Sequence, residues 1–148
     1  MNAQLTDPRD IRSFVLAGDA LFTLENVDTG NHYTYRVRKS ERTRSEYRFV
    51  SVLHRPENAD AKDYSYIGMI AGASHLTRTK AVHISPDAQS VKAFNWFWEL
   101  VRAGKPLPQQ VQFWHAGRCA RCGRVLSVPS SIASGVGPEC ERIMEQGR

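Results

Sequence analysis

The chain has 148 residues, of which 41% are hydrophobic and 24% charged, and this composition predicts one globular domain or one domain with a small appendage. No apolar run approaches the ~18–20 residues of a bilayer-spanning helix, so we expect no membrane protein. The N-terminus lacks the basic and apolar regions of a secretory signal, and an odd number of cysteines argues against an extracellular disulfide scaffold. These features predict a protein of the reducing cytoplasm.

The formal net charge of +5 comes from basic residues that are concentrated in two segments. The first cluster comprises Arg36, Arg38, Lys39, Arg42, Arg44, Arg48 and Arg55, and the second comprises Arg118, Arg121 and Arg124. Clustered arginines attract the phosphates of nucleic acids, so we interpret both segments as candidate contact surfaces. The alternative for the first cluster is a solvated hairpin loop without a partner.

Local signals predict a short helix followed by an antiparallel meander. Thr6 as a capping residue, followed by Asp7 and Pro8, is typical of a helix start, and Gly18 is expected to end this helix after about Ala17. Alternating polarity, or β-branched and aromatic content, predicts strands at residues 20–27, 32–38, 47–53 and 64–70, with a turn at 28–31 and a weaker edge strand within 74–84.

A longer helix is predicted from a cap at Ser85-Pro86-Asp87 to about Ala103. Its apolar stripe, spaced by three and four, comprises Val91, Phe94, Phe97, Trp98 and Val101. Trp96 lies off this stripe, so we expect Trp98 in the core and Trp96 over a seam, the alternative being a stacking platform or partner surface. Residues 1–108 therefore predict an α+β domain, a meander of four to five strands packed with a long helix.

The last forty residues contain the pattern H-x3-C-x2-C-x17-C, formed by His115, Cys119, Cys122 and Cys140. The two-residue gap lets both sulfurs face one point, and Cys140 falls in the first turn of a predicted helix, 138–146, where thiolate is favoured. Three thiolates and one imidazole make the tetrahedral set that Zn²⁺ prefers. We predict one structural zinc ion in residues 109–148, a zinc-knuckle or treble-clef-like module that depends on the metal to fold.

The pattern leaves two points open. The fourth ligand could instead be Glu139, Glu141, another histidine or a water molecule, and an open position of that kind would permit a catalytic zinc. The pair Cys119 and Cys122 could also be a redox couple, although no thioredoxin-like βαβ pattern surrounds it.

Residues 113–142, through H-x3-C-x2-C-G-R and S-I-x-S-G-x-G-P-x-C, resemble an uncharacterised zinc-motif family common in bacteriophage and prophage proteins, and similar modules are appended to some helicase-like proteins. Residues 22–36 and 63–68 resemble the domain that often precedes this motif. The resemblance implies a mobile-element origin, a bacterial host cell and nucleic-acid-related surroundings, and it implies no established activity.

The sequence is compatible with three classes of function. The first is a non-enzymatic binding protein that contacts nucleic acid or a nucleoprotein complex through its arginines, with Trp96 or exposed tyrosines adding base stacking. The second is a phage-encoded, anti-CRISPR-like inhibitor of a host defence complex that acts by protein contact. The third is an enzyme with a nuclease-like cluster of His54, Asp60 and Asp63, but this spacing matches no catalytic set. No phosphate-cradling glycine loop is present either, so we predict no catalysis and no small-molecule substrate.

Overall fold

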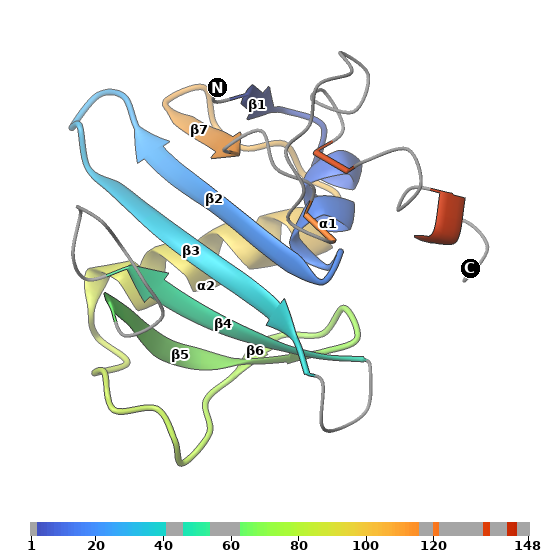
Figure 1. Ribbon diagram of the computed structural model, residues 1–148. Helices are drawn as coiled ribbons and strands as arrows, with labels where there is room; N and C mark the ends of the chain where they lie inside the picture. Colours follow the sequence, from blue (N-terminus) through green and yellow to red (C-terminus); the bar gives the residue numbers. More distant parts are fainter. Residues whose placement is uncertain are drawn as a thin grey trace.

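The computed structural model describes residues 3–40, 46–53, 63–115, 120–121, 135–136 and 142–144. These residues form an α+β fold in which a seven-stranded antiparallel sheet is covered on one face by two helices (Figure 1). The elements in chain order are β1 (Ala3–Leu5), α1 (Pro8–Val15), β2 (Asp19–Asn26), β3 (His32–Lys39), β4 (Tyr47–Leu53), β5 (Tyr64–Ala71), β6 (Leu76–Thr77), α2 (Gln89–Arg102) and β7 (Val111–His115). Across the sheet the strands follow the order β1-β7-β2-β3-β4-β5-β6.

The N-cap residue of helix α1 is Asp7, one residue after the predicted cap, Thr6. The side chain of Asp7, and not that of Thr6, accepts a hydrogen bond from the backbone N–H of Arg9, at 2.9 Å. Pro8 occupies the first turn, where its missing N–H leaves no helical bond unmade. The helix ends at Val15, and the chain then turns through Gly18, whose φ of 137° suits glycine.

The predicted meander is confirmed, with strand boundaries within one residue of the expected ones for β2 to β5. The turn between β2 and β3 is organised by Asn26, whose side-chain oxygen accepts hydrogen bonds from the backbone N–H groups of Asp28 and Thr29. The expected strand within residues 74–84 is shortened to β6, which pairs with β5 at the edge of the sheet.

Helix α2 is confirmed, but its predicted cap is not. The helix begins at Gln89 after Ala88, with no side-chain hydrogen bond at the cap. The Ser85 hydroxyl instead accepts a hydrogen bond from the backbone N–H of Asp87, which makes a turn before the helix. The whole predicted apolar stripe is buried, and Trp98 is fully inaccessible.

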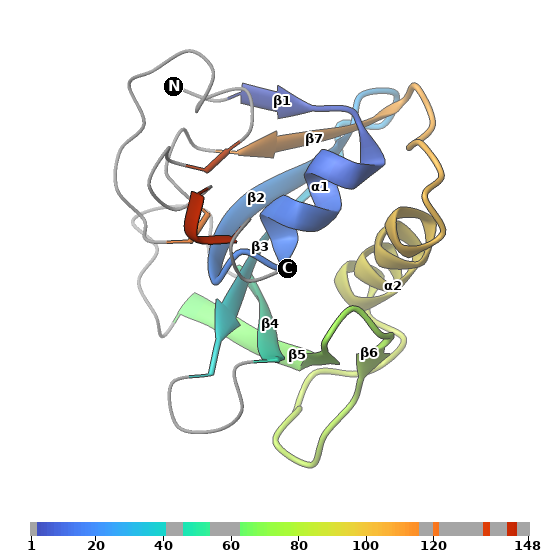
Figure 2. The same cartoon turned by 90° about the vertical axis from the view of Figure 1, so that its right-hand side faces the viewer.

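Figure 2 shows both helices on one side of the sheet, and the side chains between the sheet and the helices form the core, which is rich in aromatic rings. Phe22 of β2 and Phe113 of β7 each pack against Phe97 of α2, with ring centroids 5.7 and 5.8 Å apart. The Tyr35 hydroxyl donates a 2.6 Å hydrogen bond to the backbone oxygen of Ser90 in α2. Because the rings of Phe14 in α1 also contact Phe22 and Phe113, both helices cover the same face of the sheet.

Two strands, β1 and β7, were not predicted from the sequence. Strand β7 pairs with β2 on one side and with β1 on the other, so that Ala3 lies opposite His115. We expected the C-terminal module to begin at residue 109, yet Val111–His115 is an interior strand of the sheet. Within the part of the chain that the structure describes, no helix is long and apolar enough to cross a membrane.

Candidate nucleic-acid interface

The face of the sheet opposite the helices is turned toward the viewer in Figure 1, where α2 passes behind β2 and β3. Alternate residues of each strand point to this open face, because successive side chains of a strand lie on opposite sides. On β3 the buried pair Tyr35 and Val37 alternates with Arg36, which is partly exposed, and Arg38, which is exposed. The neighbouring strands add partly exposed side chains that share this face, namely Phe49, Ser51, Tyr64, Tyr66 and Trp114.

A small hollow lies at the centre of the open face. It has a volume of about 130 Å³ and is lined by Arg36, Arg38, Phe49, Ser51 and Tyr64. This volume is comparable to the roughly 150 Å³ of an engineered cavity that accepts a benzene molecule. The rim of the hollow therefore combines two guanidinium groups and two aromatic rings around space for one flat group.

One carboxylate, that of Asp19, partly neutralises the positive charge of the two arginines at the hollow. Asp19 Oδ1 lies 3.1 Å from Nε of Arg36 and 4.0 Å from Nε of Arg38. The Arg38 side chain is 53% exposed, against 30% for Arg36 and Asp19. Arg38 is therefore the cation that is more open to an incoming phosphate.

Tyr64 borders the hollow as a neutral hydroxyl group. Partial burial raises the pKa of Tyr64, with a smaller upward contribution from Asp63, while Arg36 acts in the opposite direction. The ring therefore offers a stacking surface and a hydrogen-bonding O–H group at neutral pH.

The other arginines predicted from the charge clusters do not all share this surface. Arg48 donates from Nε to the backbone oxygen of Leu16, at 3.0 Å, and from Nη1 to that of Tyr47, at 3.4 Å. Burial lowers the pKa of Arg48, which is consistent with a guanidinium that satisfies carbonyl groups at the end of α1. Lys39 is exposed at the end of β3, and the backbone of Arg121 lies against Gly18. Several predicted contact or catalytic residues lie outside the described residues: Arg42, Arg44, His54, Arg55, Asp60, Arg118 and Arg124.

Of the four predicted zinc ligands, the structure describes His115, which ends β7 and is 1% exposed. Its ring lies 5.2 Å from that of Phe14, centroid to centroid. The backbone of Gly135 is tight against the ring of Phe14, which a Cβ atom at this position would overlap, and such a Cβ atom would lie at an ordinary contact distance, 3.6 Å, from His115 Cδ2. Cys119, Cys122 and Cys140 lie outside the described residues, as do Glu139 and Glu141.

Short described pieces of the C-terminal segment pack onto the sheet. The backbone N–H of Ala120 donates to the oxygen of Gly135 at 2.8 Å, and the oxygen of Ala120 accepts from the N–H of Asp19. Ala120 and Val136 are 1% and 5% exposed and belong to the main hydrophobic core. Among the residues with described positions, no group of three or more histidine, cysteine, aspartate or glutamate side chains is placed to hold a metal ion.

Trp96 differs from the expectation that it covers a seam. It is 43% exposed and lines a second hollow, which lies between α2 and the β2–β3 hairpin. Sequence reasoning also missed Phe49, Ser51 and Tyr64 as residues of the candidate site. Residue alternation along β4 and β5 is apparent from the sequence. The pairing of these two strands with each other and with β3, which brings the three side chains together, is not.

The described residues define an α+β protein whose sheet has one face covered by helices and one open face with cations and aromatic rings. Residues 114–145, which span the H-x3-C-x2-C-x17-C pattern, match a family of unknown function, DUF6011. No curated protein and no solved structure matches the chain.

Proposed function

We propose that this protein binds single-stranded nucleic acid on the open face of its sheet and does so without catalysis. The observation that carries the proposal is the hollow in which Arg36 and Arg38 meet the rings of Phe49 and Tyr64. Guanidinium groups pair with phosphates, and aromatic rings stack with bases that are not already stacked in a duplex. A reducing bacterial cytoplasm, which also keeps thiolates available to a metal, is the proposed location.

The chemistry of the hollow favours an unpaired strand with little sequence preference. Stacking on an aromatic ring is tolerant of sequence because every base has a π-face, and phosphate contacts carry no sequence information. A duplex hides the faces of its bases, so it offers the two cations a ligand but leaves the two rings unused. A single strand that is bound in a protein complex of the host would offer the same phosphates and base faces.

The proposal is tested by fluorescence anisotropy with labelled single-stranded DNA and RNA and with a duplex, between about 50 and 200 mM salt. We expect the affinity for single strands to fall with salt and to exceed that for the duplex. Arg38→Gln should reduce the slope of log affinity against log salt by about one unit. Arg9→Gln is the matched control, because Arg9 is exposed on α1, away from the open face, and has the same charge.

The contribution of the rings is measured separately with Phe49→Leu, which keeps an apolar side chain but removes the aromatic face. Base stacking is worth about 1–3 kcal/mol, so we expect a loss of about 5- to 150-fold in single-strand affinity and little change for the duplex. Equal salt slopes for Arg38→Gln and Arg9→Gln, or an unchanged affinity of Phe49→Leu, would exclude the open face as the binding surface.

We further propose that His115, Cys119, Cys122 and Cys140 hold one structural Zn²⁺. The donor types fit zinc, and His115 is held on an interior strand, beside the backbone of Gly135 from the segment that contains the cysteines. Bound zinc would fix this segment in place. Because His115 lies on β7 and Ala120 is part of the core, loss of the metal should loosen β1 and β7 and not the C-terminal residues alone.

Zinc binding is tested by measuring the metal content of Cys122→Ser and of His75→Gln, a control that removes an exposed histidine from the segment just before β6. We expect the first variant to lose the metal and the second to keep one equivalent. Hydrogen exchange should then show faster exchange of the β1 and β7 amides in Cys122→Ser, with β4 and β5 unchanged. Metal retained at one equivalent in Cys122→Ser would exclude this ligand set.

A further inference from the structure

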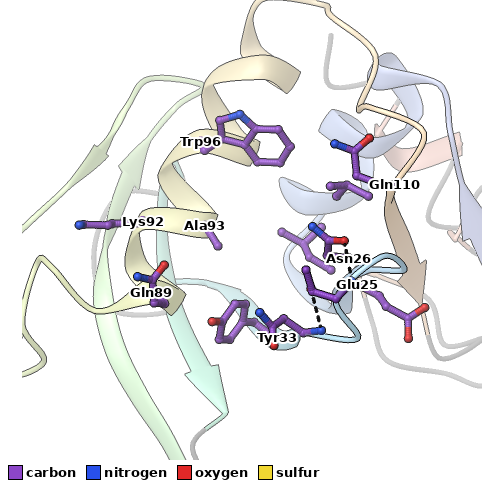
Figure 3. Close-up of a pocket in the computed structure, with 12 residues that line it drawn as sticks. Glu25, Asn26, Tyr33, Gln89, Lys92, Ala93, Trp96 and Gln110 are labelled. Carbon is purple, nitrogen blue, oxygen red and sulfur yellow. Dashed lines mark hydrogen bonds between the residues drawn. The ribbon is translucent and has the colours of Figure 1, made fainter.

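We infer that the hollow between α2 and the β2–β3 hairpin is a binding site for a nucleobase. Its volume is about 420 Å³, which falls in the range of about 300–1,000 Å³ that is typical of small-molecule sites. It lies away from the open face of the sheet, so the inference does not rest on the function proposed above. Helix α2 forms one wall, the hairpin forms another, and the residues that lead into β7 complete it (Figure 3).

Two aromatic side chains mark the opening. Figure 3 shows Trp96 of α2 at one end and Tyr33 of β3 at the other. Trp96 is 43% exposed, and Ala93 between the turns of α2 that carry Trp96 and Gln89 leaves room because its side chain is small. A flat ligand matches this opening, since it can lie against the indole ring with its apolar face and still direct its edge inward.

Side-chain amides supply the polar part of the lining. Asn31, Gln89 and Gln110 line the hollow at exposed positions, where their side-chain amides are accessible to a ligand. Asn26 is held in place because its oxygen accepts two hairpin N–H groups, which leaves its NH₂ group available as a donor. An amide offers a donor and an acceptor side by side, which is the pattern that the edge of a nucleobase requires.

The charge of the lining indicates which part of the ligand enters. Lys92 and Glu25 are the charged residues among those that line the hollow, and Figure 3 shows that the charged ends of both point away from it. A phosphate-binding site would need a surplus of cations or a set of convergent backbone N–H groups. The hollow therefore suits the uncharged base, with any phosphate left outside near the exposed Lys92.

The inference is tested on the full-length protein by NMR titration with adenosine, guanosine, cytidine and uridine, and with ribose and glucose as controls. We expect at least one nucleoside to shift the indole N–H signal of Trp96 in a saturable way, while both sugars leave it unchanged. Trp96→Ala should weaken this nucleoside by about 5- to 150-fold, and Gln89→Ala by a smaller factor. Asn95→Ala, at an exposed position of α2 that does not line the hollow, is the control and should leave nucleoside binding unchanged.

The source of the base is distinguished by comparing that nucleoside with a short oligonucleotide of the same base. An oligonucleotide that shifts Trp96 at lower concentration indicates a base within a strand, and a response to the nucleoside alone indicates a free ligand. The inference is overturned if no nucleoside shifts Trp96 at millimolar concentration, or if ribose or glucose shifts it equally. Arg38→Gln affects only the open face, so failure of the proposed function is recognised independently.

Discussion

The two faces of the sheet are built by the same strands and differ in almost every physical property. On the covered face, Phe22, Tyr35 and Phe113 are essentially inaccessible and pack ring against ring with the helices. On the open face, Arg36 follows the buried Tyr35 on the same strand. It lines a hollow together with the partly exposed ring of Phe49. One strand thus contributes to the core with one set of alternate residues and to a candidate binding surface with the other.

This division has an energetic consequence. Large-to-small substitutions of buried rings remove transfer free energy and leave a cavity, whereas substitutions on a solvated surface do neither. Substitutions on the open face should therefore cost less free energy of unfolding than those on the covered face, because its side chains are partly exposed. The following substitutions test this separation, from the largest expected effect to the smallest.

The largest effect is expected from truncating a ring of the covered face. Phe97 is fully buried and packs against both Phe22 and Phe113, so Phe97→Ala should lower the free energy of unfolding by about 3–5 kcal/mol. Phe49→Ala removes the same side chain from the open face, where Phe49 is partly buried and contacts the ring of Tyr66, and should cost a smaller amount, about 1–2 kcal/mol. Urea denaturation compares the two directly, and equal losses would show that the open face is part of the core.

A smaller effect is expected where a polar group is buried in the covered face. Tyr35→Phe removes the hydrogen bond to the backbone of Ser90 and should cost about 1 kcal/mol at neutral pH. Burial raises the pKa of Tyr35 above its ordinary value of about 10, so the folded state favours the protonated phenol.

That pKa shift has a defined sign in the pH dependence of stability. The contribution of the protonated Tyr35 is fully present below about pH 10 and is lost as the pH rises above that value, because the unfolded chain releases its proton first. Urea unfolding at about pH 7, 9 and 11 should therefore show a gap between the wild type and Tyr35→Phe that narrows at alkaline pH. A gap that stays constant would mean that the hydroxyl is not protected by burial.

The smallest effect on folding is expected at the ion pair of the open face. Asp19→Asn removes the carboxylate that partly neutralises Arg36 and Arg38, and the partly exposed pair is worth ~0.2–1 kcal/mol to folding. Single-strand affinity at low salt should rise by about two- to fivefold, because two guanidinium groups become available to phosphate. Asp7→Asn makes the same charge change beside Arg9 on α1, and an equal rise in that variant would attribute the effect to net charge alone.

Local sequence determined the elements whose pattern follows directly from backbone geometry. Strand β4 was predicted at residues 47–53, the boundaries that it has in the structure, and the apolar stripe of α2 was identified residue by residue. On β3 the same two-residue repeat separates Arg36 and Arg38 from the buried Tyr35 and Val37. These predictions succeed because a strand repeats every two residues and a helix every 3.6, whatever lies around them.

Tertiary structure decided everything that depends on a partner distant in the sequence. The short strands β1 and β7 owe their existence to pairing between two segments that are far apart in the sequence, where Leu5 lies opposite Phe113. The same long-range packing turns Arg48 toward the backbone of Leu16, away from the other arginines, and leaves Trp96 beside a hollow. Periodicity specifies which side of an element is apolar, but only the assembled fold determines what that side meets and which polar residues remain for a ligand.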